Sequence, residues 1–303
     1  MDSKSNLEKI LSDGKFAVTA EIGPPKGSDP NKIISKAEKL KDFAHAFNIT
    51  DNQTAVVRMS SLSGCSIILN LKMEPIMQIS CRDRNRIALQ SDVLGASAIG
   101  VRNILFITGD HQSFGNHPDA KGVYDLDSIQ LIQIAKNMRD NGIFQSGDII
   151  LSKNPEIFIG GAANPFADPF DYRVDRLEKK IEAGVDFIQT QSVFNLKKFN
   201  IWMDAVRSRG LDKKVHILAG ITPLKSIKMT ERMKFYVPGV DIPNEIYERI
   251  KNASDAKKEG YDIAHELICD VKKIKGIHGI HITALFWEDI IPTLVNETDI
   301  KPI

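Results

Sequence analysis

Short runs of apolar and β-branched residues recur along the chain, and longer amphipathic stretches separate them. Runs of this length predict buried strands, and the stretches between them predict helices. Eight strands are expected, at residues 16–22, 46–50, 75–81, 103–108, 157–161, 186–190, 215–219 and 279–283. Because strands and helices alternate, the strands should pair in parallel through right-handed crossovers.

The helical stretches lie between these strands, and several of them open with capping residues such as Asp29-Pro30 and Asp127. Helices are expected at residues 29–43, 58–71, 84–98, 127–141, 172–183, 224–235, 243–252 and 255–273. Another helix should follow the sixth strand and end at residue 206, and a short one should begin near 287. Eight strand–helix units normally close into a barrel. The predicted fold is a single (β/α)8 TIM barrel over residues 1–303, with extra helices near the C-terminus. A doubly wound open sheet is the alternative, but no Gly-rich phosphate-binding turn follows the first strand.

Composition narrows the class of protein. The formal net charge is +1, from 40 basic and 39 acidic residues, so nothing favours binding to nucleic acid or to a membrane surface. No apolar run is long enough for a membrane span, and residues 1–13 lack the apolar core of a signal peptide. The 3 cysteines form no C-x-x-C pair, which fits a reducing cytoplasm. His111 and His117 have no ligand spacing around them, so no metal is expected.

The fold itself nominates candidate site residues, because barrel enzymes carry their sites at the C-terminal ends of the strands. These ends are unusually polar here. They carry Glu21, Thr50, Asp51, Gln53, Ser80, Cys81, Arg82, Thr108, Gly109, Asp110, Asn164, Thr190, Gln191, Thr222 and Thr283. Any one of them could be ordinary strand-end polarity, but the whole ring indicates a site.

Three of these residues suggest specific chemistry. Glu21 follows an apolar strand and precedes two prolines. Beside an apolar ligand such a carboxyl should have a raised pKa and could act as a general acid, unless it is paired or solvated at the rim. Asp110 could hydrogen-bond a heterocycle or could be a turn aspartate. Gln191 offers both a donor and an acceptor, as recognition of a pterin edge requires.

Four basic residues, Arg173, Arg176, Lys179 and Lys180, cluster on one predicted helix. Arg176 and Lys180 are one turn apart on one face and could hold a flavin phosphate. A solvated helix face is the more common fate of such a run, and the pattern alone favours it.

Five motifs in order give the chain a resemblance to the methylenetetrahydrofolate reductase family over essentially its whole length. They are A-E-I-G-P-P, T-G-D-H-Q-S-F-G-N-H-P, G-G-A-A-N-P-F-A-D-P, L-E-K-K-I-E-A-G-V-D-F-I-Q-T-Q and A-G-I-T-P-L. The resemblance implies a barrel with a flavin at its mouth that passes a hydride to 5,10-methylenetetrahydrofolate and gives 5-methyltetrahydrofolate.

The resemblance also implies roles for individual residues. Glu21 would be the acid that protonates N10, Asp110 would contact the pterin and tune the flavin, and Gln191 would hold the folate. The residues implied to line the flavin are Thr50, Gln78, Thr108, Gly109, Asn164 and Lys180.

The sequence departs from the family pattern at several positions implied to touch the flavin. Thr108 stands where many relatives have Arg, Gln78 and Asp168 where they have His, and Asn164 where they have Tyr. The choice between FAD and FMN therefore stays open. The loop after the fourth strand resembles the version of anaerobes and acetogens, some of which receive electrons through a partner subunit. The electron donor and the oligomeric state stay open as well.

Two other functions compete with this hypothesis. One is a pterin-binding barrel that transfers methyl groups to a corrinoid protein, which needs no flavin and no acid at Glu21. The other is a flavin-binding electron-transfer subunit without folate chemistry. The presence of Glu21 and Gln191 argues against the second, because electron transfer requires neither.

Overall fold

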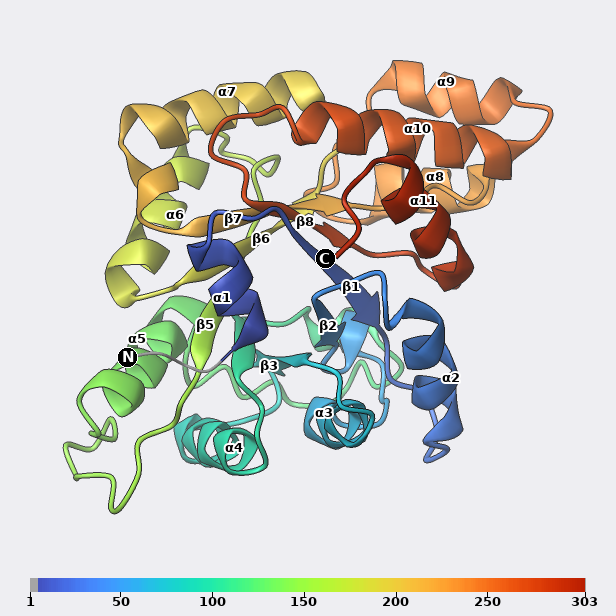
Figure 1. The fold of residues 1–303 in the computed structure, drawn as a ribbon. Coiled ribbons are helices and arrows are strands. Elements are labelled where there is room, and N and C mark those ends of the chain that lie inside the picture. The colour runs from blue at the N-terminus through green and yellow to red at the C-terminus, as the bar shows by residue number, and fades with distance from the viewer. Residues whose placement is uncertain (1–4, 303) are drawn as a thin grey trace.

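The computed structural model describes residues 5–302, and their strands close into a barrel. The strands are β1 (Ala17–Ile22), β2 (Ala46–Ile49), β3 (Pro75–Ser80), β4 (Asn103–Ile107), β5 (Phe158–Ala163), β6 (Phe187–Ser192), β7 (His216–Ile221) and β8 (Gly279–Ile282). Each pairs in parallel with the next, and β8 pairs with β1 (Figure 1). The predicted TIM barrel is confirmed.

Helices surround this barrel on the outside (Figure 1). They are α2 (Asn31–Leu40), α3 (Ser61–Asn70), α4 (Arg86–Ala98), α5 (Ser128–Asp140), α6 (Tyr172–Ala183), α7 (Leu196–Ser208), α8 (Ile227–Tyr236), α9 (Asn244–Asn252), α10 (Ala256–Val271) and α11 (Ile291–Glu297). The extra helices α8 and α9 precede α10 between β7 and β8, as predicted. Among residues 5–302 no helix is long and apolar enough to cross a membrane.

Local sequence explains where several helices begin and end. The Asp127 side chain accepts hydrogen bonds from Ile129 N and Gln130 N, and the Gln130 side chain returns one to Asp127 N, which makes a capping box at the start of α5. Helix α6 ends at Gly184, whose φ of +105° suits a residue without a Cβ.

Strands β5, β6 and β7 end two residues later than predicted. The sequence predicted an end where the apolar run stops, but hydrogen bonding to the neighbouring strands continues through small and polar residues. The correction matters because it places Gln191 inside β6 rather than in the loop after it.

A short helix that the sequence analysis did not predict, α1 (Asn6–Ser12), precedes the barrel. Its apolar side chains pack into the N-terminal end of the barrel interior, against side chains from seven strands: Ala17, Ala46, Ile76, Leu105, Phe158, Phe187 and Leu218. The Glu74 carboxylate accepts hydrogen bonds from Asn6 N and Leu7 N and so caps the helix N-terminus. Helix α1 therefore covers this end of the barrel.

Candidate active site

A cavity of about 480 Å³ lies at the C-terminal ends of the strands, opposite α1. Of the nine residues to which the resemblance gives a role, six line it: Glu21, Gln78, Thr108, Asn164, Lys180 and Gln191. The strand-end candidates Thr190 and Thr283 line it as well. Thr50, Gly109 and Asp110 lie beside the cavity but are not part of its lining. Residues from β1, β3, β4, β5, β6, β7 and β8 contribute to the wall, so the ring of strand ends does converge on one place.

The strand period of two residues explains which side chains enter the barrel interior. On β1, Ala17 lies in the apolar layer against α1, Thr19 lies in the middle, and Glu21 lies at the mouth. On β6, Phe187, Gln189 and Gln191 repeat the same order. Glu21 and Gln191 at the mouth therefore each lie above a polar residue and an apolar one on the same strand.

The middle layer is a buried polar network that forms the floor of the cavity. Asn48 Nδ2 donates to Gln189 Oε1, and the His281 ring contacts Thr19 Oγ1 at 3.0 Å and Thr283 Oγ1 at 3.2 Å. Burial lowers the pKa of His281 to about 4, so its imidazole is neutral near pH 7. Gln189 and His281 also line the cavity, which gives the floor neutral donors and acceptors.

Glu21 is the one carboxyl on the described lining of this cavity. Gln53 Nε2 donates a hydrogen bond to its Oε1 over 3.3 Å. Burial raises the pKa of Glu21 to about 7, although the hydrogen bond from Gln53 and the charges of Lys36 and Arg58 oppose that shift. The raised pKa keeps the protonated form of this carboxyl available near neutral pH, as a general acid requires.

Gln191 lies in a bulge between β6 and β7. The pairing of these strands shifts between Gln189 and Ser192, and bulges of this kind commonly redirect side chains next to active sites. Gly220 on β7 allows the close approach, because a Cβ there would lie 2.5 Å from Thr190 O. The bulge thereby directs the Gln191 side chain to the cavity wall.

Cationic side chains line the opposite wall, where β5 and β6 face β1 across the barrel. Arg173, Arg176 and Lys180 of α6 all line the cavity, and the Lys180 Nζ donates to Ala162 O. Burial, together with the nearby positive charge of Arg176, lowers the pKa of Lys180 to about 8. Within residues 5–302 neither Arg176 nor Lys180 forms an ion pair with a carboxylate. Lys179 is exposed, Arg173 and Arg176 are half-buried, and Lys180 is buried. The solvated face that the charge pattern alone favours is therefore wrong for Lys180.

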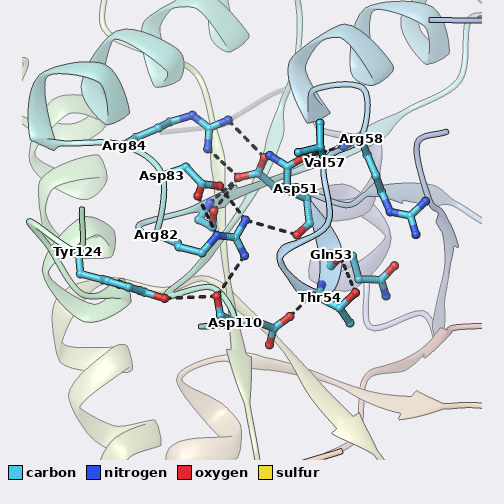
Figure 2. A network of polar contacts seen from close by, with 12 residues as sticks. Asp51, Gln53, Thr54, Val57, Arg58, Arg82, Asp83, Arg84, Asp110 and Tyr124 are labelled. Atoms are coloured by element: carbon cyan, nitrogen blue, oxygen red, sulfur yellow. Dashed lines mark hydrogen bonds and ion pairs between the residues drawn. The ribbon is translucent and has the colours of Figure 1, made fainter. Parts of the chain in front are cut away.

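A buried network of charged residues supports the loops at the other side of the mouth (Figure 2). The Asp51 carboxylate accepts hydrogen bonds from Ser80 N, Ser80 Oγ and two nitrogens of Arg84. Arg82 donates to the Asp110 carbonyl over 3.1 Å and to the Asn52 carbonyl over 3.3 Å, and its side chain is only 4% exposed. The network therefore joins the loops that follow β2, β3 and β4.

The three predicted residues outside the lining belong to this edge of the mouth. The exposed Asp110 carboxylate accepts from Thr54 N over 3.0 Å. Gly109 has a φ of +92°, and a Cβ there would meet Ser80 Cβ at 3.0 Å, so the turn after β4 requires glycine. Thr50 is buried, and its Oγ1 has no hydrogen-bond partner within residues 5–302.

Gln189, His281, Ser128 and Ser192 were not predicted as site residues, although all four line the cavity. Two of them could have been found. Gln189 and His281 are polar residues inside otherwise apolar strands, and they lie two positions before Gln191 and Thr283, which the strand ends nominated.

The comparison with known protein families decides which kind of barrel this is. The family model described as methylenetetrahydrofolate reductase matches residues 6–299. This chain belongs to the methylenetetrahydrofolate reductase family. It is therefore an enzyme whose family acts on methylenetetrahydrofolate, and the resemblance found in the sequence is confirmed.

Individual members of the methylenetetrahydrofolate reductase family are distant in sequence. The 5,10-methylenetetrahydrofolate reductase of Pectobacterium carotovorum is 23% identical over 95% of this chain and 92% of its own length. That of Escherichia coli is 21% identical over 95% of this chain and 93% of its own length. Methylenetetrahydrofolate reductase 1 of Schizosaccharomyces pombe is 23% identical over 93% of this chain and 46% of its own length.

A solved structure shares the fold over nearly the whole chain. An uncharacterized protein from Clostridium thermocellum, which binds two copies of 5-methyl-5,6,7,8-tetrahydrofolic acid, superimposes with a TM-score of 0.70 at 16% identity. The match covers 97% of this chain and 99% of that one.

Proposed function

We propose that this chain uses a bound flavin to reduce 5,10-methylenetetrahydrofolate to 5-methyltetrahydrofolate, with Glu21 as the acid. The observation that carries the proposal is the position of the Glu21 carboxyl in the cavity, opposite the cationic wall. Burial there raises the pKa of Glu21 to about 7. Membership of the family supports the substrate. The binding of 5-methyltetrahydrofolic acid by a structural neighbour agrees with it.

Two observations agree with a bound flavin. Arg176 and Lys180 provide positive charge without a carboxylate partner among the described residues, as a phosphate group would need. The Thr50 hydroxyl is buried and lacks a hydrogen-bond partner within the same residues. Gln78, Thr108, Gly109 and Asn164 are proposed to complete the site. A reduced flavin would supply the hydride.

Glu21 is proposed to start the reaction by proton transfer. Its O–H bond breaks, an N–H bond forms at N10 of the folate, and the bond from N10 to the methylene carbon breaks. A carboxylate and a 5-iminium cation result, and the iminium carbon accepts the hydride to become the methyl group. Gln191 is proposed to hold the pterin edge, and Asp110 to contact the pterin from the rim.

The first experiment is an absorption spectrum of the pure protein, followed by anaerobic mixing of the photoreduced form with 5,10-methylenetetrahydrofolate. We expect flavin bands that return on mixing, with 5-methyltetrahydrofolate as the product. A protein that stays colourless after reconstitution with FMN and with FAD would contradict the mechanism. Methyl transfer to a corrinoid by such a colourless protein would instead support the pterin methyltransferase.

The rate of flavin reoxidation by the substrate should fall as the pH rises above about 7. Burial raises the pKa of Glu21, so the proton-donating form persists up to that pH and is lost above it. The expected loss approaches tenfold for each further pH unit. Single-turnover absorbance measurements from pH 6 to 9 check this, and a rate constant that does not change over that range would argue against Glu21 as the acid.

Replacing Lys180 by Met should weaken flavin binding roughly 10- to 100-fold, because a hydrogen bond to a charged phosphate is lost. Methionine keeps the buried stem of the side chain, so the fold should survive. The matched control is Lys179→Met, since Lys179 is exposed and its ammonium contacts the Tyr172 hydroxyl and ring but no carboxylate among residues 5–302. Fluorescence titration of the flavin-free protein with FMN and FAD measures both. Equal affinities in the two variants would remove Lys180 from the flavin site.

A further inference from the structure

The loop of residues 51–58, which follows β2, contacts both carboxyls at the mouth of the cavity. Gln53 Nε2 donates to Glu21 Oε1 over 3.3 Å. The backbone N–H of the next residue, Thr54, donates to Asp110 Oδ2 over 3.0 Å. Two adjacent residues therefore link the carboxyl at the end of β1 to the carboxylate after β4. Figure 2 shows Gln53 and Thr54 beside Asp110.

The 51–58 loop has a backbone that needs outside support. Asn52, Thr54 and Ala55 have φ values of 44°, 55° and 55°, a left-handed region that non-glycine residues seldom occupy. Such strain persists only where surrounding contacts impose it, and it clusters at functional sites. The loop thus holds a costly conformation beside the proposed acid.

Contacts from two other loops impose this conformation. The buried Arg82 guanidinium donates to Asn52 O over 3.3 Å, and Asn116 Oδ1 accepts from Val57 N over 3.1 Å. At Gly115 the two loops meet backbone to backbone, since a Cβ there would lie 1.8 Å from Ala55 O. The position of Gln53 is therefore fixed from both sides.

We propose that Gln53 is a positioning residue that orients the Glu21 carboxyl for proton transfer, and that Arg82 and Asp110 hold the 51–58 loop for that purpose. With Oε1 accepting from Gln53, Oε2 is the oxygen that carries the transferred proton. This inference rests on the proposed role of Glu21 as the acid, and it adds Gln53 as the residue that orients the Glu21 carboxyl.

The charged groups around Glu21 do not orient its carboxyl. Lys36 of α2 and Arg58 favour the carboxylate, while Glu288, after β8, disfavours it. Lys36 Nζ is itself paired with Glu288 at 2.5 Å, so their effects on Glu21 largely offset each other. The Arg58 guanidinium donates to Pro24 O instead of to Glu21. Gln53 is thus the group that touches the carboxyl directly within residues 5–302.

The test compares Gln53→Met with wild type in the flavin-loaded enzyme. Methionine has a similar length but no N–H, so the carboxylate loses a donated hydrogen bond. The pH at which the reoxidation rate falls should rise by roughly one unit. The rate of flavin reoxidation at the low-pH plateau should fall about tenfold, because the Glu21 carboxyl is no longer held in the orientation for proton transfer. KM for the folate should change little. Gln133→Met, at an exposed position of α5, is the matched control and should match wild type.

A second readout does not depend on turnover. The carboxylic C=O stretch of Glu21 can be followed by infrared difference spectroscopy against Glu21→Gln. Its midpoint should move upward in Gln53→Met by the same amount as the rate profile. Gly115→Ala, which forces the two loops apart, should move it in the same direction and by less.

An infrared midpoint that is unchanged in Gln53→Met, or that moves as much in Gln133→Met, overturns the proposal even if Glu21 is the acid. If the infrared midpoint shifts in Gln53→Met but Glu21→Gln turns over at the full rate, the contact between Gln53 and Glu21 stands. The proposed function, with Glu21 as the acid, is then overturned instead.

Discussion

Replacing Glu21 by Gln is expected to lower the rate of reduced-flavin oxidation by 5,10-methylenetetrahydrofolate by about 10²- to 10⁴-fold. Glutamine keeps the size of the side chain and can still contact Gln53, but its amide protons are not acidic enough to protonate N10. The ring of the substrate then stays closed, and no iminium carbon forms to accept the hydride. Anaerobic stopped-flow absorbance of the photoreduced protein measures the rate, with the flavin content checked beforehand.

The control for this variant is Glu288→Gln, in the same corner of the mouth. Glu288 is paired with Lys36 and acts on Glu21 only through its charge, so its loss should change the rate by less than about tenfold. If Glu21→Gln reduced the folate at the wild-type rate, proton transfer from this residue would be excluded. Undiminished physiological electron transfer in that variant would favour the flavin electron-transfer subunit considered from the sequence.

The second large effect concerns stability. Asp51→Ala should lower the free energy of unfolding by about 3 kcal/mol, because it leaves the buried N–H and hydroxyl of Ser80 without their acceptor. It also removes one of the two carboxylate partners of Arg84, which keeps Asp92 at 2.9 Å. The Asp51 side chain has 0% exposure and lies 2.7 Å from Arg84. It also accepts two hydrogen bonds from Ser80, at 2.9 Å each. Urea unfolding followed by circular dichroism measures the change.

Asp289→Ala provides the comparison for Asp51→Ala. Asp289 also lies 2.7 Å from a cation, Lys39, but its side chain is 70% exposed, so water replaces the lost partner and stability should hardly change. Equal losses in the two variants would mean that burial does not decide the strength of these pairs. It would also mean that the network in Figure 2 does not stabilise the loops at the mouth of the cavity.

The fold was predictable because the alternation of strands and helices is a local property of the sequence. The convergence of the strand ends follows from the barrel, which explains why Glu21 and Gln191 could be predicted from their positions, whereas Lys180 of α6 was implied by the resemblance to the family. The strand register that extends β6 through Gln191 was not predictable, because it depends on hydrogen bonds to β7. Helix α1 was missed because it is only 7 residues long, although its buried Leu7, Ile10 and Leu11 have helical spacing.

The direction of individual side chains was the other limit. Nothing local shows that Arg176 faces the cavity while Lys179 faces water, because both belong to one charged run. The contact between Gln53 and Glu21 joins residues 32 positions apart through a loop in a left-handed conformation. Such contacts depend on how the loops after separate strands pack against each other. The sequence pattern of one strand does not predict them.

Helix α1 has a practical consequence for handling the enzyme. It covers the end of the barrel opposite the cavity, so a tether attached to the exposed Lys9 of α1 emerges on the face away from the chemistry (Figure 1). Molecules immobilised through that tether on an electrode would all present their mouths to solution. Substrate could then reach the cavity freely, but any current to the cavity would have to cross the whole length of the barrel.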